Sequence, residues 1–283
     1  MNALSRRTAL ALILGCLAWP ARSQPPTVEQ AQDKVVVTNA FYRATLLRAR
    51  GGTLSEVAFV DGKPVLGGDF LYTDHGLYPE GNTVGSDKET NATMEVRQEG
   101  ERVTVESRGT LRGEGALREP DRRVDYAFTY TLDSSPTIHV RWSATPSFAL
   151  REPSGFFSYL VSVPHYSEWF AKTADGVIFQ PAGPVSTRTF QSANEPLDFE
   201  DPWVGVLLPD GGIVAWSHLA GSPALTNVFM HESGQGSTGF FCAWLCGAGV
   251  VDLVPEQPWT AEFDLHLWPQ AAQSTLAMPG FLG

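Results

Sequence analysis

The strongest constraint on the fold of this chain is an alternation of apolar and polar residues with a period of two. In one stretch, two alternating segments flank a turn at residues 133–136. The apolar members of these segments are Val124, Tyr126, Phe128, Tyr130, Leu132, Ile138, Val140 and Trp142. A period of two places alternate side chains on one face of a β-strand. After residue 24, no apolar stripe of helical period continues for three turns. The sequence therefore predicts an almost all-β chain.

Further hairpins follow the same pattern. Segments at 94–96 and 103–105 flank a Glu-Gly-Glu turn, and segments at 204–208 and 213–215 flank a Pro-Asp-Gly-Gly turn. Breaks in the alternation that are rich in Gly, Pro, Asn and charge predict three long loops. These loops are residues 67–90, 112–123 and 182–202. Functional groups are expected in them, because loops carry function more often than the strands they join.

The strands form one set. No linker, composition shift or fixed-period repeat divides them. Residues 24–269 are therefore predicted to form a single domain, followed by a loose tail at 270–283. Two large antiparallel sheets packed face to face accommodate such a chain and leave one concave face for a ligand.

The charge balance limits the classes of partner. The chain has 31 Asp and Glu against 20 Lys and Arg, for a formal net charge of −11. An acidic protein repels the phosphate backbone, so nucleic acid is not expected as a partner. The sequence has no Gly-rich phosphate loop at a strand-to-helix turn and no closely spaced set of metal ligands. Neither a cofactor nor a metal is predicted, and the oligomeric state is not indicated.

The N-terminus is organised like an export signal. Arg6 and Arg7 precede an apolar run at residues 9–18, which is too short to span a bilayer. Residues 21–23 are Ala-Arg-Ser, with small residues where a signal peptidase cleaves. Removal of residues 1–23 is therefore predicted. The mature protein is expected to be periplasmic or secreted, without a transmembrane segment.

The export route has alternatives. Residues 5–10 resemble a twin-arginine signal, although the Sec route also fits them. Residues 13–16 resemble a lipoprotein box, so the alternative to cleavage after Ser23 is an anchor on Cys16.

Only two cysteines follow the predicted cleavage point, Cys242 and Cys246. On one strand they would lie about 13 Å apart, which is beyond disulfide reach. Buried free thiols are the preferred interpretation, and a bridge would require an intervening turn.

Several segments resemble the galactose-mutarotase-like superfamily, which includes aldose 1-epimerases and polysaccharide lyases. The segments that carry this resemblance are residues 35–39, 44–46, 51–54 and 61–66 near the start and 253–256 and 259–263 near the end. Together they extend over most of residues 34–269. The resemblance implies an antiparallel β-supersandwich fold and a carbohydrate as the partner.

The resemblance also implies an acid and a base. To open an aldose ring, a base removes the anomeric hydroxyl proton and an acid protonates the ring oxygen, roles that suit glutamate and histidine. His165, in Val-Pro-His-Tyr, resembles the catalytic histidine of the epimerases and is the candidate acid. Glu232, which precedes Leu253 by 21 residues, resembles their glutamate base. His75, in Asp-His-Gly, resembles their other sugar-contacting histidine.

Aromatic residues close to these positions are candidates for stacking on a sugar ring, namely Tyr166, Trp169 and Trp203. Core packing explains the same rings equally well. A solvated turn is likewise the alternative for Glu232, and a hydrogen-bonded loop residue is the alternative for each histidine. His139, His218 and His266 lie in strand-like runs and are interpreted as structural.

Two other functions fit the sequence. In a polysaccharide lyase, Tyr166 beside His165 would be the base and Arg188 would neutralise the uronate, although no Lys or Arg cluster marks a polyanion groove. A non-catalytic module that binds glycan or protein would explain why the epimerases' arginine motif is absent before His75. The preferred prediction is an exported carbohydrate-active protein with epimerase-like ring opening.

Overall fold

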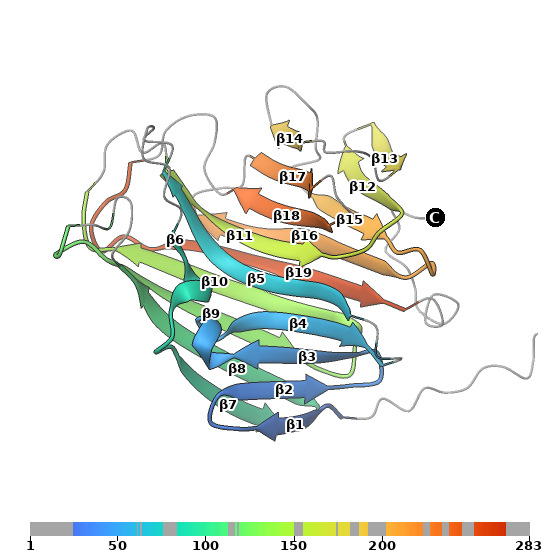
Figure 1. The fold of residues 1–283 in the computed structure, drawn as a ribbon, viewed down its shortest axis with the longest axis horizontal. Coiled ribbons are helices and arrows are strands. Elements are labelled where there is room, and N and C mark those ends of the chain that lie inside the picture. The colour runs from blue at the N-terminus through green and yellow to red at the C-terminus, as the bar shows by residue number, and fades with distance from the viewer. Residues whose placement is uncertain are drawn as a thin grey trace, which may run out of the picture.

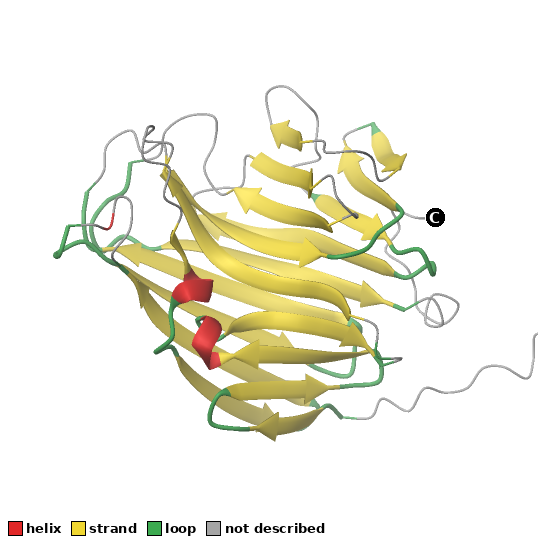
Figure 2. Ribbon diagram, viewed as in Figure 1, coloured by secondary structure: helices red, strands yellow, loops and turns green. Residues whose placement is uncertain are grey.

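The computed structural model describes residues 25–60, 62, 64–75, 84–112, 117, 119–149, 155–173, 175–181, 187–191, 202–222, 227–233, 238–244 and 252–269. These residues form two large antiparallel sheets, which Figure 1 shows packed against each other. Figure 2 shows that helix in the described part is limited to short turns. The all-β prediction is therefore confirmed. No helix among the described residues is long and apolar enough to cross a membrane.

The first sheet has ten strands. In order across the sheet they are β1 (Thr27–Gln30), β2 (Lys34–Thr38), β3 (Tyr42–Leu47), β4 (Thr53–Phe59), β5 (Pro64–His75), β11 (Gly155–Val163), β18 (Thr238–Trp244), β17 (Asn227–Ser233) and β14 (Thr187–Gln191), while β6 (Val84–Gly85) pairs with β5. Two short 3-10 helices, η1 (Arg48–Arg50) and η2 (Ser86–Lys88), lie beside this sheet.

The second sheet has nine strands. In order they are β13 (Gly176–Pro181), β12 (Glu168–Thr173), β15 (Trp203–Leu207), β16 (Ile213–Ser222), β19 (Trp259–Trp268), β10 (Thr137–Pro146), β9 (Val124–Leu132), β8 (Arg102–Leu111) and β7 (Thr93–Glu99). The hairpins expected from the sequence are present as β7–β8, β9–β10 and β15–β16.

The core lies between the two sheets, and the alternation along each strand determines what enters it. On β10 the side chains of Ile138, Val140 and Trp142 are at most 1% exposed, whereas His139 and Arg141 point to the outer face. One cluster of buried side chains contains residues from both sheets. Apolar burial between the sheets is therefore the main stabilising term, as expected for a sandwich.

The structure corrects two of the predicted loops. β5 continues through residues 67–75, and β14 lies within residues 182–202. Glycines and an aspartate interrupt the alternation of β5, but the strand lies between β4 and β11, and pairing satisfies its backbone polar groups. The composition of the segment does not reveal this pairing.

The predicted export signal, Cys246 and the predicted tail lie outside the described residues, as does the side chain of Cys242.

Gly51 lies between η1 and β4 and connects this turn to η2 and β9 through hydrogen bonds. Its φ is +74°, in the left-handed region, and its N–H donates to the Glu89 carbonyl at 2.7 Å. Its own carbonyl accepts from the Tyr126 hydroxyl at 3.1 Å. A Cβ atom at this position would overlap the backbone carbonyl of Ser86. Glycine is therefore required both by the backbone conformation and by the close approach of η2.

Gly51→Ala is expected to lower the free energy of unfolding by about 2 kcal/mol, because strain at positive φ adds to the displacement of η2. Urea denaturation monitored by tryptophan fluorescence would measure the change. Gly100→Ala is the matched control, since Gly100 has a φ of +60° but a Cβ atom added there would meet no atom within 4 Å. Equal losses in the two variants would contradict the role assigned to the contact with η2.

Candidate functional site

His165 lies where the chain crosses from one sheet to the other. β11 ends at Val163 in the ten-stranded sheet, and β12 begins at Glu168 in the nine-stranded sheet. The connecting turn is fixed by Ser167, whose N–H and Oγ both donate to the Leu207 carbonyl, at 2.7 and 3.1 Å. The His165 side chain is exposed in this turn. It is therefore available to a ligand at this end of the molecule.

The register places Glu232 at the same end of the ten-stranded sheet. Glu232 pairs with Gly239 on β18, and Gly239 pairs with Val163 on β11. Two strand spacings of about 4.8 Å put the backbone of Glu232 about 10 Å from that of Val163. Arg188, on β14, pairs with Met230, two residues before Glu232. The side chains of Glu232 and Arg188 lie outside the described part of the structure.

His75 is placed differently. It pairs with Gly155, at the opposite end of β11 from Val163. Eight residues separate these two positions, which corresponds to about 26 Å at about 3.3 Å per residue. The register thus brings His165 and Glu232 toward one end of the sheet and leaves His75 at the other. The side chain of His75 also lies outside the described part.

The candidate aromatic residues separate into two groups. Tyr166 and Trp169 are only 4% and 2% exposed and belong to the core between the sheets. Both rings are therefore packing residues and offer no face to a sugar in this structure. Trp203 is partly exposed on the outer face of the nine-stranded sheet. Alternation alone could not separate the groups, because it does not tell which face of a strand is inward.

Trp203 belongs to a stack of rings that the sequence interpretation missed. Its ring lies on His266 with centroids 4.4 Å apart, and His266 lies on Trp268 with centroids 4.9 Å apart. His266 Nδ1 and Nε2 contact the hydroxyls of Thr137 and Ser217 at 3.1 and 2.9 Å. Burial of the imidazole lowers the pKa of His266 from 6.5 to about 4. His266 is thus a neutral, hydrogen-bonded residue, consistent with the structural role predicted for it.

His139 also lies on this outer face, between two carboxylates. Its Nδ1 is 2.8 Å from Asp264 Oδ1 and its Nε2 is 3.0 Å from Glu262 Oε1. The signal in the sequence is the run Glu262, Asp264 and His266 at every second position of one strand, which places all three on one face. Among the described residues, no group of three or more His, Cys, Asp and Glu is arranged to hold a metal ion.

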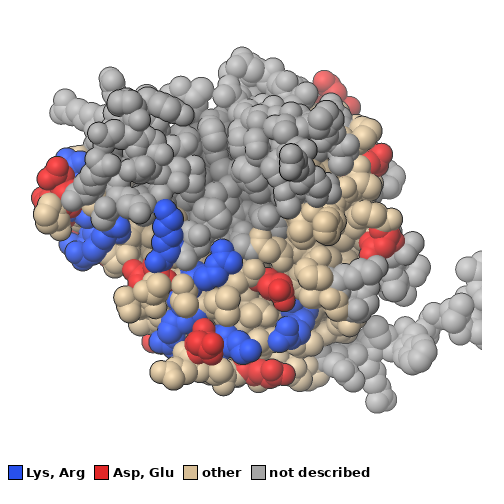
Figure 3. All heavy atoms as spheres, in the orientation of Figure 1, with Lys and Arg blue, Asp and Glu red and all other residues tan. Residues whose placement is uncertain are grey.

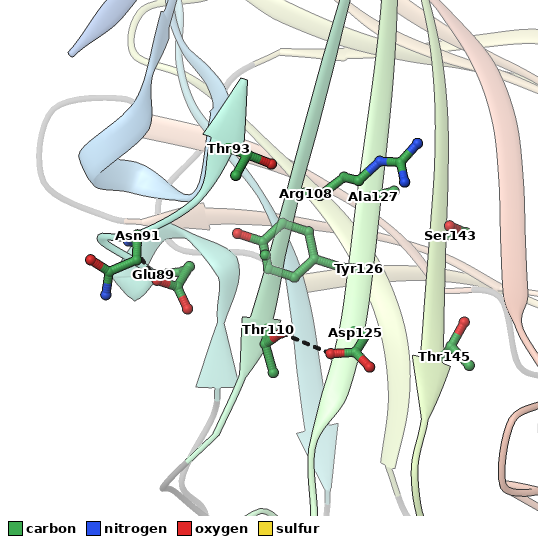
Figure 4. Close-up of a pocket in the computed structure, with 11 residues that line it drawn as sticks. Glu89, Asn91, Thr93, Arg108, Thr110, Asp125, Tyr126, Ala127, Ser143 and Thr145 are labelled. Atoms are coloured by element: carbon green, nitrogen blue, oxygen red, sulfur yellow. Dashed lines mark hydrogen bonds between the residues drawn. The ribbon is translucent and has the colours of Figure 1, made fainter. Parts of the chain in front are cut away.

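A polar groove lies further along the same outer face, over β7 to β10. Its volume is about 560 Å³. Figure 4 shows side chains from neighbouring strands around it, including Thr93, Thr110, Asp125, Ser143 and Thr145. The sequence did not indicate this groove, because its residues come together only through the register of four strands.

Comparison with known proteins identifies the fold. No protein-family model matches the sequence, and no curated protein matches it significantly. Among solved structures, galactose 1-epimerase from Lactobacillus acidophilus NCFM is similar with a TM-score of 0.52 and 12% identity, covering 86% of this chain and 97% of that protein.

Two larger proteins contain a similar region. A TPR-domain containing protein from Parabacteroides distasonis ATCC 8503 has a TM-score of 0.52 and 11% identity over 87% of this chain, which spans about half (49%) of it. 4-α-Glucanotransferase from Thermococcus litoralis has a TM-score of 0.53 and 8% identity over 87% of this chain and 41% of the enzyme. At these identities the likeness shows fold alone, and the expected galactose-mutarotase-like supersandwich is confirmed.

Proposed function

We propose that this galactose-mutarotase-like supersandwich is a carbohydrate-active protein that opens and recloses an aldose ring, with His165 as the acid and Glu232 as the base. The observation that supports the pair is the register from Glu232 through Gly239 to Val163, two residues before His165. The backbones of Glu232 and Val163 are about 10 Å apart, a separation that can accommodate one sugar ring. The predicted export signal would place this activity outside the cytoplasm.

The proposed chemistry needs only proton transfers. Glu232 removes the proton of the anomeric hydroxyl. The anomeric oxygen then forms a double bond to C1 as the bond from C1 to the ring oxygen breaks. His165 donates a proton to the departing ring oxygen. Rotation about the bond between C1 and C2 then presents the other face of the aldehyde, and the reverse transfers close the ring. The exposed position of His165 suits exchange of its proton with solvent.

The lyase alternative is less well supported. It requires Tyr166 as the base, and this ring is 4% exposed within the core. On the molecular face that Figure 3 shows, the described Lys and Arg residues lie among Asp and Glu rather than in a patch of one sign. A polyuronate substrate would meet no concentrated positive charge among these residues.

A non-catalytic glycan-binding module is the second candidate function. Two observations favour it. Tyr166 and Trp169 are buried, and His75 pairs with the end of β11 opposite to the end that His165 follows. The buried rings and His75 therefore do not supply the sugar contacts expected of them in a complete epimerase site. Binding without turnover needs neither an acid nor a base.

Optical rotation separates the two functions. The purified protein is mixed with freshly dissolved α-anomers of glucose, galactose and other hexoses, and the approach to anomeric equilibrium is followed. Ring opening by the protein is expected to accelerate this approach for at least one hexose, in proportion to protein concentration. If the rate in buffer is unchanged for every hexose tested, the epimerase-like function is rejected.

A further inference from the structure

The groove on the outer face of the nine-stranded sheet is hollow because its floor carries short side chains. Cross-strand pairing aligns Arg108 with Ala127 and Ala127 with Ser143, and it aligns Thr110 with Asp125 and Asp125 with Thr145. Directly paired residues share a face of the sheet. Ala127 therefore lies between Arg108 and Ser143, and Asp125 lies between Thr110 and Thr145, as Figure 4 shows.

One wall of the groove comes from the segment between η2 and β7. The N–H of Asn91 donates to Glu89 Oε1 at 2.6 Å, which fixes the turn of this segment. The carbonyl of Glu89 accepts from the N–H of Gly51 at 2.7 Å, which ties the wall to the first sheet. The Glu89 carboxylate and the Asn91 amide therefore stand beside the groove on an anchored backbone.

The charges of the lining are largely compensated within the protein. Asp125 accepts hydrogen bonds from Thr110 Oγ1 at 2.7 Å and from Arg123 Nε at 3.0 Å. Arg108 lies 3.6 Å from Glu106. The lining thus presents hydroxyl, amide and carboxylate groups and the guanidinium of Arg108, without an excess of positive charge. Such a surface matches a neutral ligand with many hydroxyls and disfavours a polyanion, which the net charge of −11 would also repel.

We infer that this groove is a binding site for a neutral saccharide, separate from the end of the ten-stranded sheet where His165 lies. The volume of about 560 Å³ lies within the range of small-molecule sites. No aromatic face is offered by Tyr126, which is 3% exposed and donates its hydroxyl to the Gly51 carbonyl. The saccharide is held by hydrogen bonds to exposed groups, so the dissociation constant is expected to be about 1 mM.

The binding is tested by NMR titration of the full protein with maltohexaose, cellohexaose and galactose, with oligogalacturonate as the charged comparison. Amide signals of residues 108–110, 125–127 and 143–145 are expected to shift with at least one neutral saccharide and not with oligogalacturonate. The absence of shifts at about 20 mM of every neutral saccharide would overturn the proposal. Preferential binding of oligogalacturonate would overturn it as well.

Substitutions locate the site. Ala127→Trp fills the floor and is expected to weaken binding about tenfold or more by steric exclusion. Thr129→Trp is the matched control, because Thr129 lies two residues along the same face of β9 and does not line the groove. Asp125→Ala is a second test that adds no bulk, and binding that survives both groove substitutions contradicts the proposal. His165→Ala should leave saccharide binding to the groove unchanged. The NMR titration tests the groove and polarimetry tests ring opening, so failure of one proposal is distinguishable from failure of the other.

Discussion

Mutarotation of the preferred hexose is expected to slow by about 10²–10⁴-fold when His165 is replaced by alanine. The exposed imidazole in the crossover turn is the proposed proton donor to the ring oxygen. Because the donor acts mainly on the transition state, kcat should fall while sugar affinity changes little. Polarimetry with a series of sugar concentrations separates kcat from KM. Loss of affinity with unchanged kcat would contradict the acid role.

Glu232→Gln tests the partner in the same assay. The amide cannot accept the anomeric proton, so a loss of similar size is expected, and the double variant should lose little more than either single variant. Glu95→Gln is the control, because Glu95 is an exposed carboxylate on β7 of the other sheet. Circular dichroism should show unchanged β structure in all of these variants. If Glu232→Gln retains full activity, Glu232 is not the base.

The sequence predicted those strands that have one buried face and one solvent-exposed face. Along β9 and β10 the buried residues are the apolar members of the alternation, and the residues between them, all polar except Ala127, point outward. The pattern weakened in β5, an interior strand of the ten-stranded sheet. β5 contains two glycines and two aspartates, and its extent is determined by pairing with β11 rather than by its own composition.

The site was harder to predict because its geometry depends on register. The spacing of His165 and Glu232 along the chain does not show that β18 lies between β11 and β17, and neither does it show that His75 pairs with the far end of β11. Likewise, Trp169 and Trp203 look equally suitable for stacking on a sugar. Only the packing of two sheets buries the first ring and leaves the second partly exposed. A long-range pairing cannot be read from local periodicity.

Acidification is expected to destabilise the protein through His266. The imidazole lies between Trp203 and Trp268 and contacts the hydroxyls of Thr137 and Ser217. In the unfolded chain it has a pKa of about 6.5, whereas burial lowers the pKa to about 4 in the folded state. Between these values the unfolded state binds a proton that the folded state does not. The contribution of His266 to stability is therefore present above pH 6.5 and declines as the pH falls toward 4.

The expected loss is about 3 kcal/mol of unfolding free energy between pH 7 and pH 4, since one pKa unit corresponds to about 1.4 kcal/mol. Urea denaturation at several pH values measures it, although other groups also contribute to the slope. His266→Gln isolates the contribution of this residue, because glutamine retains hydrogen-bonding capacity and does not titrate. The pH-dependent loss should be about 3 kcal/mol smaller in this variant than in the unmodified protein.

The comparison depends on the difference in pH slope rather than on the stability of the variant at pH 7, which also reflects altered packing against Trp203 and Trp268. His165→Gln is the matched control, since it removes an exposed histidine from the crossover turn and leaves the buried stack intact. The pH slope of His266→Gln is expected to be smaller than the slope of this control. Parallel slopes for His266→Gln and the unmodified protein would mean that His266 binds its proton equally well in both states. In that case the stacked tryptophans stabilise the imidazolium enough to cancel the effect of burial.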